Sequence, residues 1–420
     1  MLPAALRIPA FRRLVTASTL SITGSMATFV MLPVVVWEQT GSSATFGLVM
    51  TGGSIGMIVA MPFGGVIADR YDRRRVLLLG DAVALLNAVL MLLAVTAQAW
   101  WALPFLSFVS TALGSLFVSA GPALRRDVVP DELRAQANAI HTGGVSVSNL
   151  LGPLVGGALY ACLGFSSVIV FDIVSYGLSF VLVLGIRVAP RAGLAALTSV
   201  AGGALRRLRR DLAAGMSLTR RDPYLRLGAI ANLVNGAANG FLLVAVVPWL
   251  DTTLDLPSAA WGGAIAAMGG AAVLGSVALG RIGDRVPAAT IVKAGAASFA
   301  VAALMLLGTP SLARVVVAFA LIGLVNAAIM IGATTITQRR VPSTHMGRTS
   351  SLQMLSHQLT QGITTAGAAV VVATAGPQVA MAIAVFGFVC SSAIYWRGAT
   401  ASVRTRPVDP VSDSDLSLGA

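Results

Sequence analysis

The chain has 420 residues, of which 56% are hydrophobic and only 11% are charged. Soluble domains carry about 25% charged residues, so this composition excludes an ordinary soluble protein. The formal net charge of +13 does not indicate a nucleic-acid-binding protein, because the basic residues form short clusters between apolar runs and no basic domain.

Apolar runs recur from one end of the chain to the other. Each is long enough to cross the hydrocarbon core of a bilayer, about 30 Å thick, as a helix. This pattern predicts an all-α, multi-pass membrane protein with twelve transmembrane helices. In chain order, the predicted spans are residues 12–37, 44–68, 76–97, 100–124, 135–160, 164–186, 224–250, 258–281, 288–309, 312–337, 350–375 and 377–397.

The basic residues predict the orientation of these spans. If the chain crosses the membrane at each predicted span in turn, all but one of the 29 lysines and arginines lie on the same side of the membrane as the N-terminus. Arg314 is the exception. Loops rich in lysine and arginine are retained on the cytoplasmic side, so we expect both termini to be cytoplasmic. A composition rich in arginine, alanine and glycine favours a bacterial source, which would place the protein in the bacterial cell membrane.

The two halves of the chain resemble each other. Pro33 matches Pro248 at the same offset at which Asp69 matches Asp284. An even number of helices in each half gives both halves the same direction in the membrane, which is the arrangement of a rocking transporter with its site between the halves. The predicted domains are a six-helix bundle at 1–186, a basic cytoplasmic linker at 187–223, a second six-helix bundle at 224–397 and a disordered cytoplasmic tail at 398–420.

The stretch GGVIADRYDRRRV at 64–76 concentrates charge between the second and third spans. It resembles the G-x-x-x-D-R-x-G-R-R/K loop of the major facilitator superfamily, with Asp72 where that family usually has glycine. The resemblance covers residues 10–397 and implies the twelve-helix fold of a transporter. The gating residues that it implies are Gly65, Asp69, Arg70, Arg73 and Arg74, with a partial second copy at Asp284 and Arg285.

The chemistry of this loop suggests two roles. Arg73–Arg75 are expected to hold the loop on the cytoplasmic side. In the family, the residue at the position of Asp69 faces the positive N-terminus of the eleventh helix, which we expect to begin at Thr349–Ser351. Asp69 would then latch the inner gate. The alternative is that the loop is only a topological anchor.

The fifth predicted helix carries Gly152, Pro153, Gly156 and Gly157. These residues resemble the G-P-x-x-G-G signature that the family associates with export, and the preceding stretch GPALRRDVVPDELRAQANAI is similar to the branch with siderophore and macrolide exporters. Ordinary glycine packing in a membrane helix is the alternative. Drug:proton antiporters of the family often have an arginine in helix four, where this chain has Ser110.

Ionisable residues inside predicted spans are candidates for proton coupling. These are Asp172, Glu38 and Asp81. Each also has a structural interpretation: Asp172 as a hydrogen-bonded residue of a supporting helix, Asp81 as a partner of Arg73–Arg75, and Glu38 as a solvent-exposed group at the outer interface. His141 and His357 are interpreted as packing residues rather than proton carriers.

Asparagines mark the candidate substrate cavity. Asn232, Asn235 and Asn239 follow one another at helical spacing in helix seven, and this amide face would either bind a polar group of the substrate or bond to neighbouring helices. Asn149 and Asn326 are weaker cavity candidates.

The sequence contains no G-x-x-x-x-G-K-[ST] phosphate-binding loop and no metal-ligand or catalytic spacing, so no cofactor, metal site or enzymatic activity is expected. Our hypothesis is a monomeric secondary active exporter of drug-like or lipophilic, amphipathic metabolites, which works by alternating access and proton antiport and contributes to drug resistance. Its partners would be a small-molecule substrate, protons and the lipid bilayer, and not nucleic acid. Alternatives are a siderophore, macrolide or lysophospholipid transporter of the same fold, or a non-coupled lipid scramblase or receptor.

Overall fold

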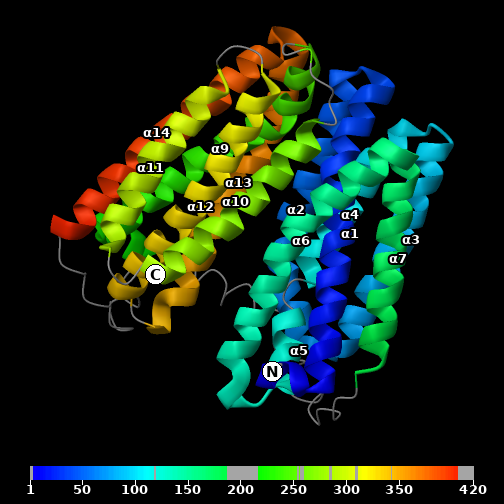
Figure 1. Ribbon diagram of the computed structural model, residues 1–420, viewed down its shortest axis with the longest axis horizontal. Helices are drawn as coiled ribbons and strands as arrows, with labels where there is room; N and C mark the ends of the chain where they lie inside the picture. Colours follow the sequence, from blue (N-terminus) through cyan, green and yellow to red (C-terminus); the bar gives the residue numbers. More distant parts are fainter. Residues whose placement is uncertain are drawn as a thin grey trace, which may run out of the picture. The chain divides into compact units, whose positions relative to one another are not determined.

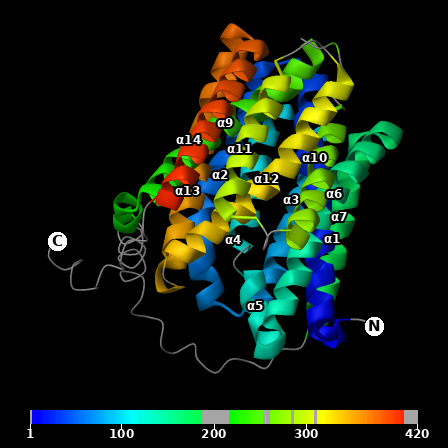
Figure 2. The same cartoon turned by 60° about the vertical axis from the view of Figure 1, so that its left-hand side comes forward.

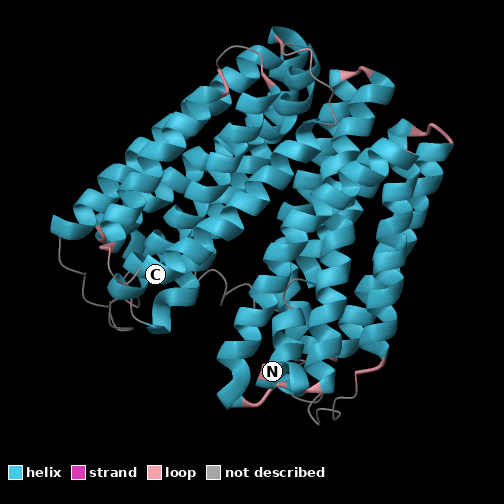
Figure 3. Ribbon diagram, viewed as in Figure 1, coloured by secondary structure: helices cyan, strands magenta, loops and turns pink. Residues whose placement is uncertain are grey.

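A computed structural model describes residues 3–117, 120–186, 216–252, 255, 260–282, 286–307, 311–341 and 343–404. Every regular element in these ranges is a helix (Figures 1 and 3). The α-helices are α1 (Pro9–Thr40), α2 (Ser43–Arg70), α3 (Arg73–Thr96), α4 (Leu103–Phe117), α5 (Ala120–Val128), α6 (Arg134–Leu163), α7 (Phe165–Leu184), α9 (Pro223–Thr252), α10 (Ala260–Ile282), α11 (Ala288–Met305), α12 (Leu312–Arg340), α13 (Ser343–Ala375) and α14 (Pro377–Arg404).

The chain divides into two compact units. The first comprises residues 1–197 with 250–266, and the second comprises 198–249 with 267–420. In the first unit, α1 packs against α6 and α7, α2 packs against α4, and α3 packs against α7. In the second, α11 packs against α12 and α14, and the two views in Figures 1 and 2 show α11 and α14 side by side.

Both units expose many large apolar side chains, as a lipid-facing surface requires. Trp101, Leu163, Ile363 and Phe386 are each at least 70% exposed. Within the described residues, ten helical segments are long and apolar enough to cross a membrane. Helix α2 contributes only a shorter apolar stretch, Ala44–Ala60, and α13 is not among the ten, so the number twelve stays a prediction.

Helices α13 and α14 extend furthest past the ends that hydropathy predicts. Helix α13 begins at Ser343, so the expected start at Thr349–Ser351 is wrong and the positive end of this helix lies more than one turn earlier. Helix α14 continues to Arg404, so the expected end of ordered structure at 397 is also wrong. The extra turns of α14 are held by packing, because Ala399 is fully buried and the carbonyl oxygen of Ser402 accepts a hydrogen bond from Arg340.

Candidate functional site

Arg73 and Arg74, in the first turn of α3, bind α5 and the C-terminal end of α7. Arg73 Nη1 lies 2.7 Å from Asp127 Oδ2 and donates to the carbonyl oxygen of Ala123 at 3.1 Å, both on α5. Arg74 donates to the carbonyl oxygen of Leu184 at 2.5 Å, where α7 ends. Helix C-termini carry unsatisfied carbonyl groups and partial negative charge, so guanidinium groups stabilise them.

Asp72 caps α3 at its N-terminus. Its Oδ1 accepts a hydrogen bond from the backbone N–H of Arg75 at 2.9 Å. Carboxylates at this position satisfy a free backbone N–H group and complement the helix dipole. The presence of Asp72 where the family usually has glycine therefore has a local structural reason. A search of the sequence for N-cap residues could have found it.

The remaining gating residues lie beyond what the structure describes. Gly65, Asp69 and Arg70 belong to α2, but their side chains are outside the described part of the chain, and Asp284 and Arg285 fall in an undescribed range. The proposed latch therefore stays a prediction.

The fifth-helix motif lies in a close contact between α6 and α1. A Cβ atom built on Gly152 would lie 2.5 Å from Met26 Cβ and 2.9 Å from the carbonyl oxygen of Thr23. A Cβ atom on Gly156 would lie 3.0 Å from the Cα atom of Ala27, whereas one on Gly157 would meet no atom within 4 Å. Two glycines of the motif thus allow the helices to touch, and the third does not take part.

Hydrogen bonds between hydroxyl and carbonyl groups continue this contact toward the start of α6. Ser148 Oγ donates to the carbonyl oxygen of Thr19 at 2.8 Å, and Thr23 Oγ1 donates to Ser148 Oγ at 3.0 Å. Gly144 lies one further turn along, where an added Cβ would lie 2.6 Å from Thr19 Oγ1. Residues 144, 148, 152 and 156 thus form one small-residue face with four-residue spacing, which we call the α1–α6 seam.

The three candidate proton carriers occupy separate sites. Asp172 is 4% exposed on α7, where the hydroxyl of Ser175 lies 3.4 Å from its Oδ1. Asp81 on α3 accepts a hydrogen bond from Ser179 of α7 at 2.7 Å. Glu38 is exposed on α1 and accepts a hydrogen bond from Tyr160.

The expected pairing of Asp81 with Arg73–Arg75 is wrong for the described residues. Arg73 binds Asp127 and Arg74 binds carbonyl groups of α7, while the hydrogen bond of Asp81 goes to Ser179. Asp81 lies two turns into α3, and the arginines reach neighbouring helix ends instead of turning back along their own helix.

The asparagines of α9 face two different neighbours. Asn232 Oδ1 accepts a hydrogen bond from Tyr395 of α14 at 2.8 Å. Asn235 Oδ1 accepts one from Asn239 Nδ2 at 3.0 Å and lies 3.1 Å from His357 Nε2 of α13. The other ring nitrogen of His357 lies 3.1 Å from Gln358 Oε1. Half-buried amide and imidazole groups therefore form one cluster, Asn235, Asn239, His357 and Gln358, which we call the α9–α13 polar cluster.

The other candidates lie outside this cluster. Asn149 on α6 and Asn326 on α12 are exposed. His141 is half-buried on α6, close enough to Arg125 for the two charges to interact.

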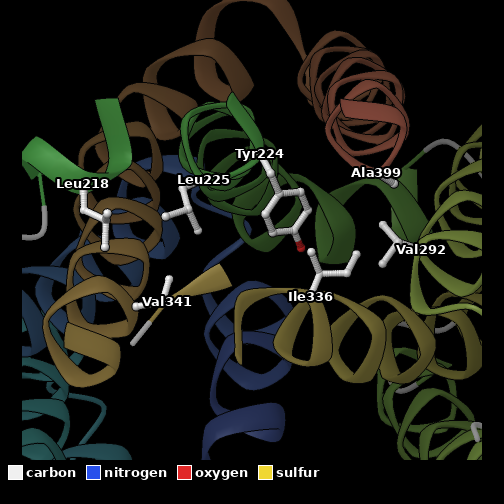
Figure 4. Close-up of a cluster of buried hydrophobic side chains, with 7 residues drawn as sticks. All are labelled: Leu218, Tyr224, Leu225, Val292, Ile336, Val341 and Ala399. Carbon is white, nitrogen blue, oxygen red and sulfur yellow. The ribbon is translucent and has the colours of Figure 1, made fainter. Parts of the chain in front are cut away.

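Sequence reasoning missed a buried ion pair. Asp222 Oδ2 lies 2.9 Å from Arg340 Nε, with side-chain exposures of 1% and 4%. Asp222 Oδ1 also accepts hydrogen bonds from the backbone N–H groups of Tyr224 and Leu225, at the start of α9. Tyr224, Leu225 and Val341, which are close in sequence to the pair, belong to a cluster of buried apolar side chains that also includes residues of α11 and α14 (Figure 4). The sequence Asp222-Pro223 signals a helix start and could have identified the cap, although not the arginine.

Comparisons with known proteins agree with this architecture. The family model described as Major Facilitator Superfamily matches residues 14–365. An enterobactin exporter of Escherichia coli O1:K1 is 36% identical over 168 residues, 37% of this chain and 38% of the relative. A Na⁺, Li⁺, K⁺/H⁺ antiporter of Planococcus maritimus is 29% identical over 158 residues, 37% of each chain. Each matched segment thus covers well under half of these relatives.

Solved structures share the fold over almost the whole chain. A bacterial homologue of the iron transporter ferroportin, crystallised in an inward-facing state, has a TM-score of 0.72 at 14% identity and covers 95% of this chain and 100% of its own. A bacterial homologue of the human lysosomal transporter Spinster has a TM-score of 0.69 at 16% identity and covers 98% of this chain and 100% of its own.

Proposed function

Because this chain belongs to the major facilitator superfamily and is a multi-pass transport protein rather than an enzyme, we propose that it is a secondary active exporter of amphipathic small molecules. The observation that supports export is the α1–α6 seam. Gly152 and Gly156 of the export-associated motif are the residues that bring the two helices together. The similarity to an enterobactin exporter supports the same direction of transport and makes a siderophore one candidate cargo.

We further propose proton antiport, with Asp172 as the proton-carrying group. Asp172 is buried, and among the described residues no arginine or lysine forms an ion pair with it. A buried carboxyl group bound only by hydroxyl groups gains stability when it is protonated, and it must be solvated or paired to ionise. Alternating exposure during transport would supply that change.

Efflux of a fluorescent amphipathic dye from loaded bacterial cells tests export and coupling together. We expect cells that express the protein to lose dye faster than cells with an empty vector, and an uncoupler to abolish the difference. Unchanged efflux without a proton gradient would contradict proton antiport. Absence of dye transport in proteoliposomes, combined with flipping of labelled lipids, would favour a scramblase instead.

The α9–α13 polar cluster is proposed as a contact for the polar group of the cargo. His357→Ala should weaken the apparent affinity for cargo by about tenfold, because one lost hydrogen bond corresponds to about 1 kcal/mol or slightly more. The measurement is the cargo concentration that gives half-maximal efflux. Gln338→Ala, which changes an exposed amide outside the cluster, is the control. Equal effects of both variants would refute the assignment.

A further inference from the structure

A pocket of about 370 Å³ opens between α5 and α6. Helix α5 lies at the same end of the first unit as the N-terminus (Figure 1). Its lining is polar and basic, with no acidic side chain: Pro122, Arg125, Arg126, Arg134, Asn138 and Thr142. Neither the export motif nor the candidate proton carriers contribute to it.

Two acidic residues next to the pocket lining in sequence already form ion pairs. Asp127 binds Arg73 at 2.7 Å, and Asp131 binds Arg134 Nη2 at 2.7 Å. Among the described residues, no carboxylate forms an ion pair with Arg125 or Arg126. Two adjacent guanidinium groups that repel each other therefore face the pocket without a counter-charge, and Arg125 is also half-buried.

The hydrogen-bond donors around the pocket match an oxyanion. Arg134, Asn138 and Thr142 follow at four-residue spacing, so α6 presents them on one face. The Nε–H group of Arg134 is buried and has no hydrogen-bond partner. A buried donor without a partner is unfavourable. Arginine forks bind phosphate and carboxylate groups with two parallel hydrogen bonds.

We propose that this pocket is a binding site for an oxyanion of the phosphate or carboxylate class. The anionic group belongs either to a phospholipid headgroup or to a soluble molecule. The pocket does not depend on the direction or the coupling of transport, so the proposal stands apart from the proposed function.

Thermal unfolding of the full-length protein in detergent tests the site, with two probes. One arm adds phosphatidylglycerol and uses phosphatidylcholine as the neutral comparison. The other arm adds pyrophosphate and uses potassium chloride at the same ionic strength. We expect a saturable rise in the unfolding temperature with at least one anionic probe. A response to the lipid alone assigns the headgroup, and a response to pyrophosphate alone assigns a soluble anion.

Two variants locate the effect in the pocket. R125Q/R126Q should weaken the apparent affinity for the responding probe by about tenfold or more, because it removes two charge-assisted partners. R7Q/R12Q removes the same charge from exposed residues outside the pocket and should retain the response. T142F fills the pocket from an exposed position without changing charge, and should lose the response even if R125Q/R126Q does not fold. No saturable shift in the wild type, or a full response in T142F, would overturn the proposal.

Discussion

Replacing Asp222 by alanine is expected to destabilise the second unit more than any other single change that we predict. The substitution leaves Arg340 as an unpaired charge at a site where only 4% of its side chain is exposed. Removal of one partner from a buried ion pair typically lowers the free energy of unfolding by about 3–5 kcal/mol. Loss of the cap at the start of α9 adds about 1 kcal/mol.

The measurement is the unfolding temperature of purified protein, which should fall by roughly 10 °C or more. Arg339→Ala is the matched control, because this neighbouring arginine is exposed and should shift the temperature little. The double variant Asp222→Ala/Arg340→Met should recover part of the loss, since no buried charge then lacks a partner. If Asp222→Ala unfolds at the wild-type temperature, the pair does not hold this end of the unit together.

The ion pair of Asp222 and Arg340 connects helices whose joint movement matters for transport. Arg340 ends α12, Asp222 precedes α9, and the same guanidinium group donates to the carbonyl oxygen of Ser402 in α14 at 3.0 Å. Tyr224 of α9 adds a hydrogen bond to Ala333 of α12 at 3.2 Å. Three helices are thus fixed at one end, which would let them move as one body during alternating access.

The positions of most helices could be predicted from the apolar runs, because the length of an apolar run determines whether it can cross a bilayer. The prediction failed at helix ends that are polar. Hydropathy ends the tenth span at residue 337 and starts the eleventh at 350, yet α12 runs to Arg340 and α13 begins at Ser343. Hydroxyl groups explain part of the difference, since Thr337 donates to the carbonyl oxygen one turn earlier and so stays compatible with a helix.

Contacts between helices could not be predicted from the sequence. Asp222 and Arg340 are 118 positions apart, and no periodicity links them. The glycine motif of α6 was recognised from the sequence. In the second half, the glycines of a comparable contact are on the other helix: a Cβ atom on Gly240 of α9 would lie 2.7 Å from the carbonyl oxygen of Gln361 in α13. A search for the motif in α13 alone cannot find this contact.

Alanine at Gly152 and Gly156 should abolish most of the proposed export while leaving the protein in the membrane. Each added Cβ atom would lie 3.0 Å or less from atoms of α1, and several of those atoms belong to the backbone and cannot rotate away. The helices must then separate, and overpacking of this kind typically changes stability by about 1–3 kcal/mol. We expect the initial rate of dye efflux to fall by about tenfold or more, because an error of about 1 Å in helix position is large for a working site.

Gly157→Ala is the matched control for the seam. It adds the same methyl group to the same helix and the same motif, but no atom lies within 4 Å of the new Cβ atom. If the motif acts through close packing of α1 and α6, this variant should transport at the wild-type rate while G152A/G156A does not. If all three glycines are equally sensitive, the motif acts through backbone flexibility of α6, and the seam is not the reason for its glycines. Membrane abundance of each variant, measured by immunoblot, separates lost transport from lost protein.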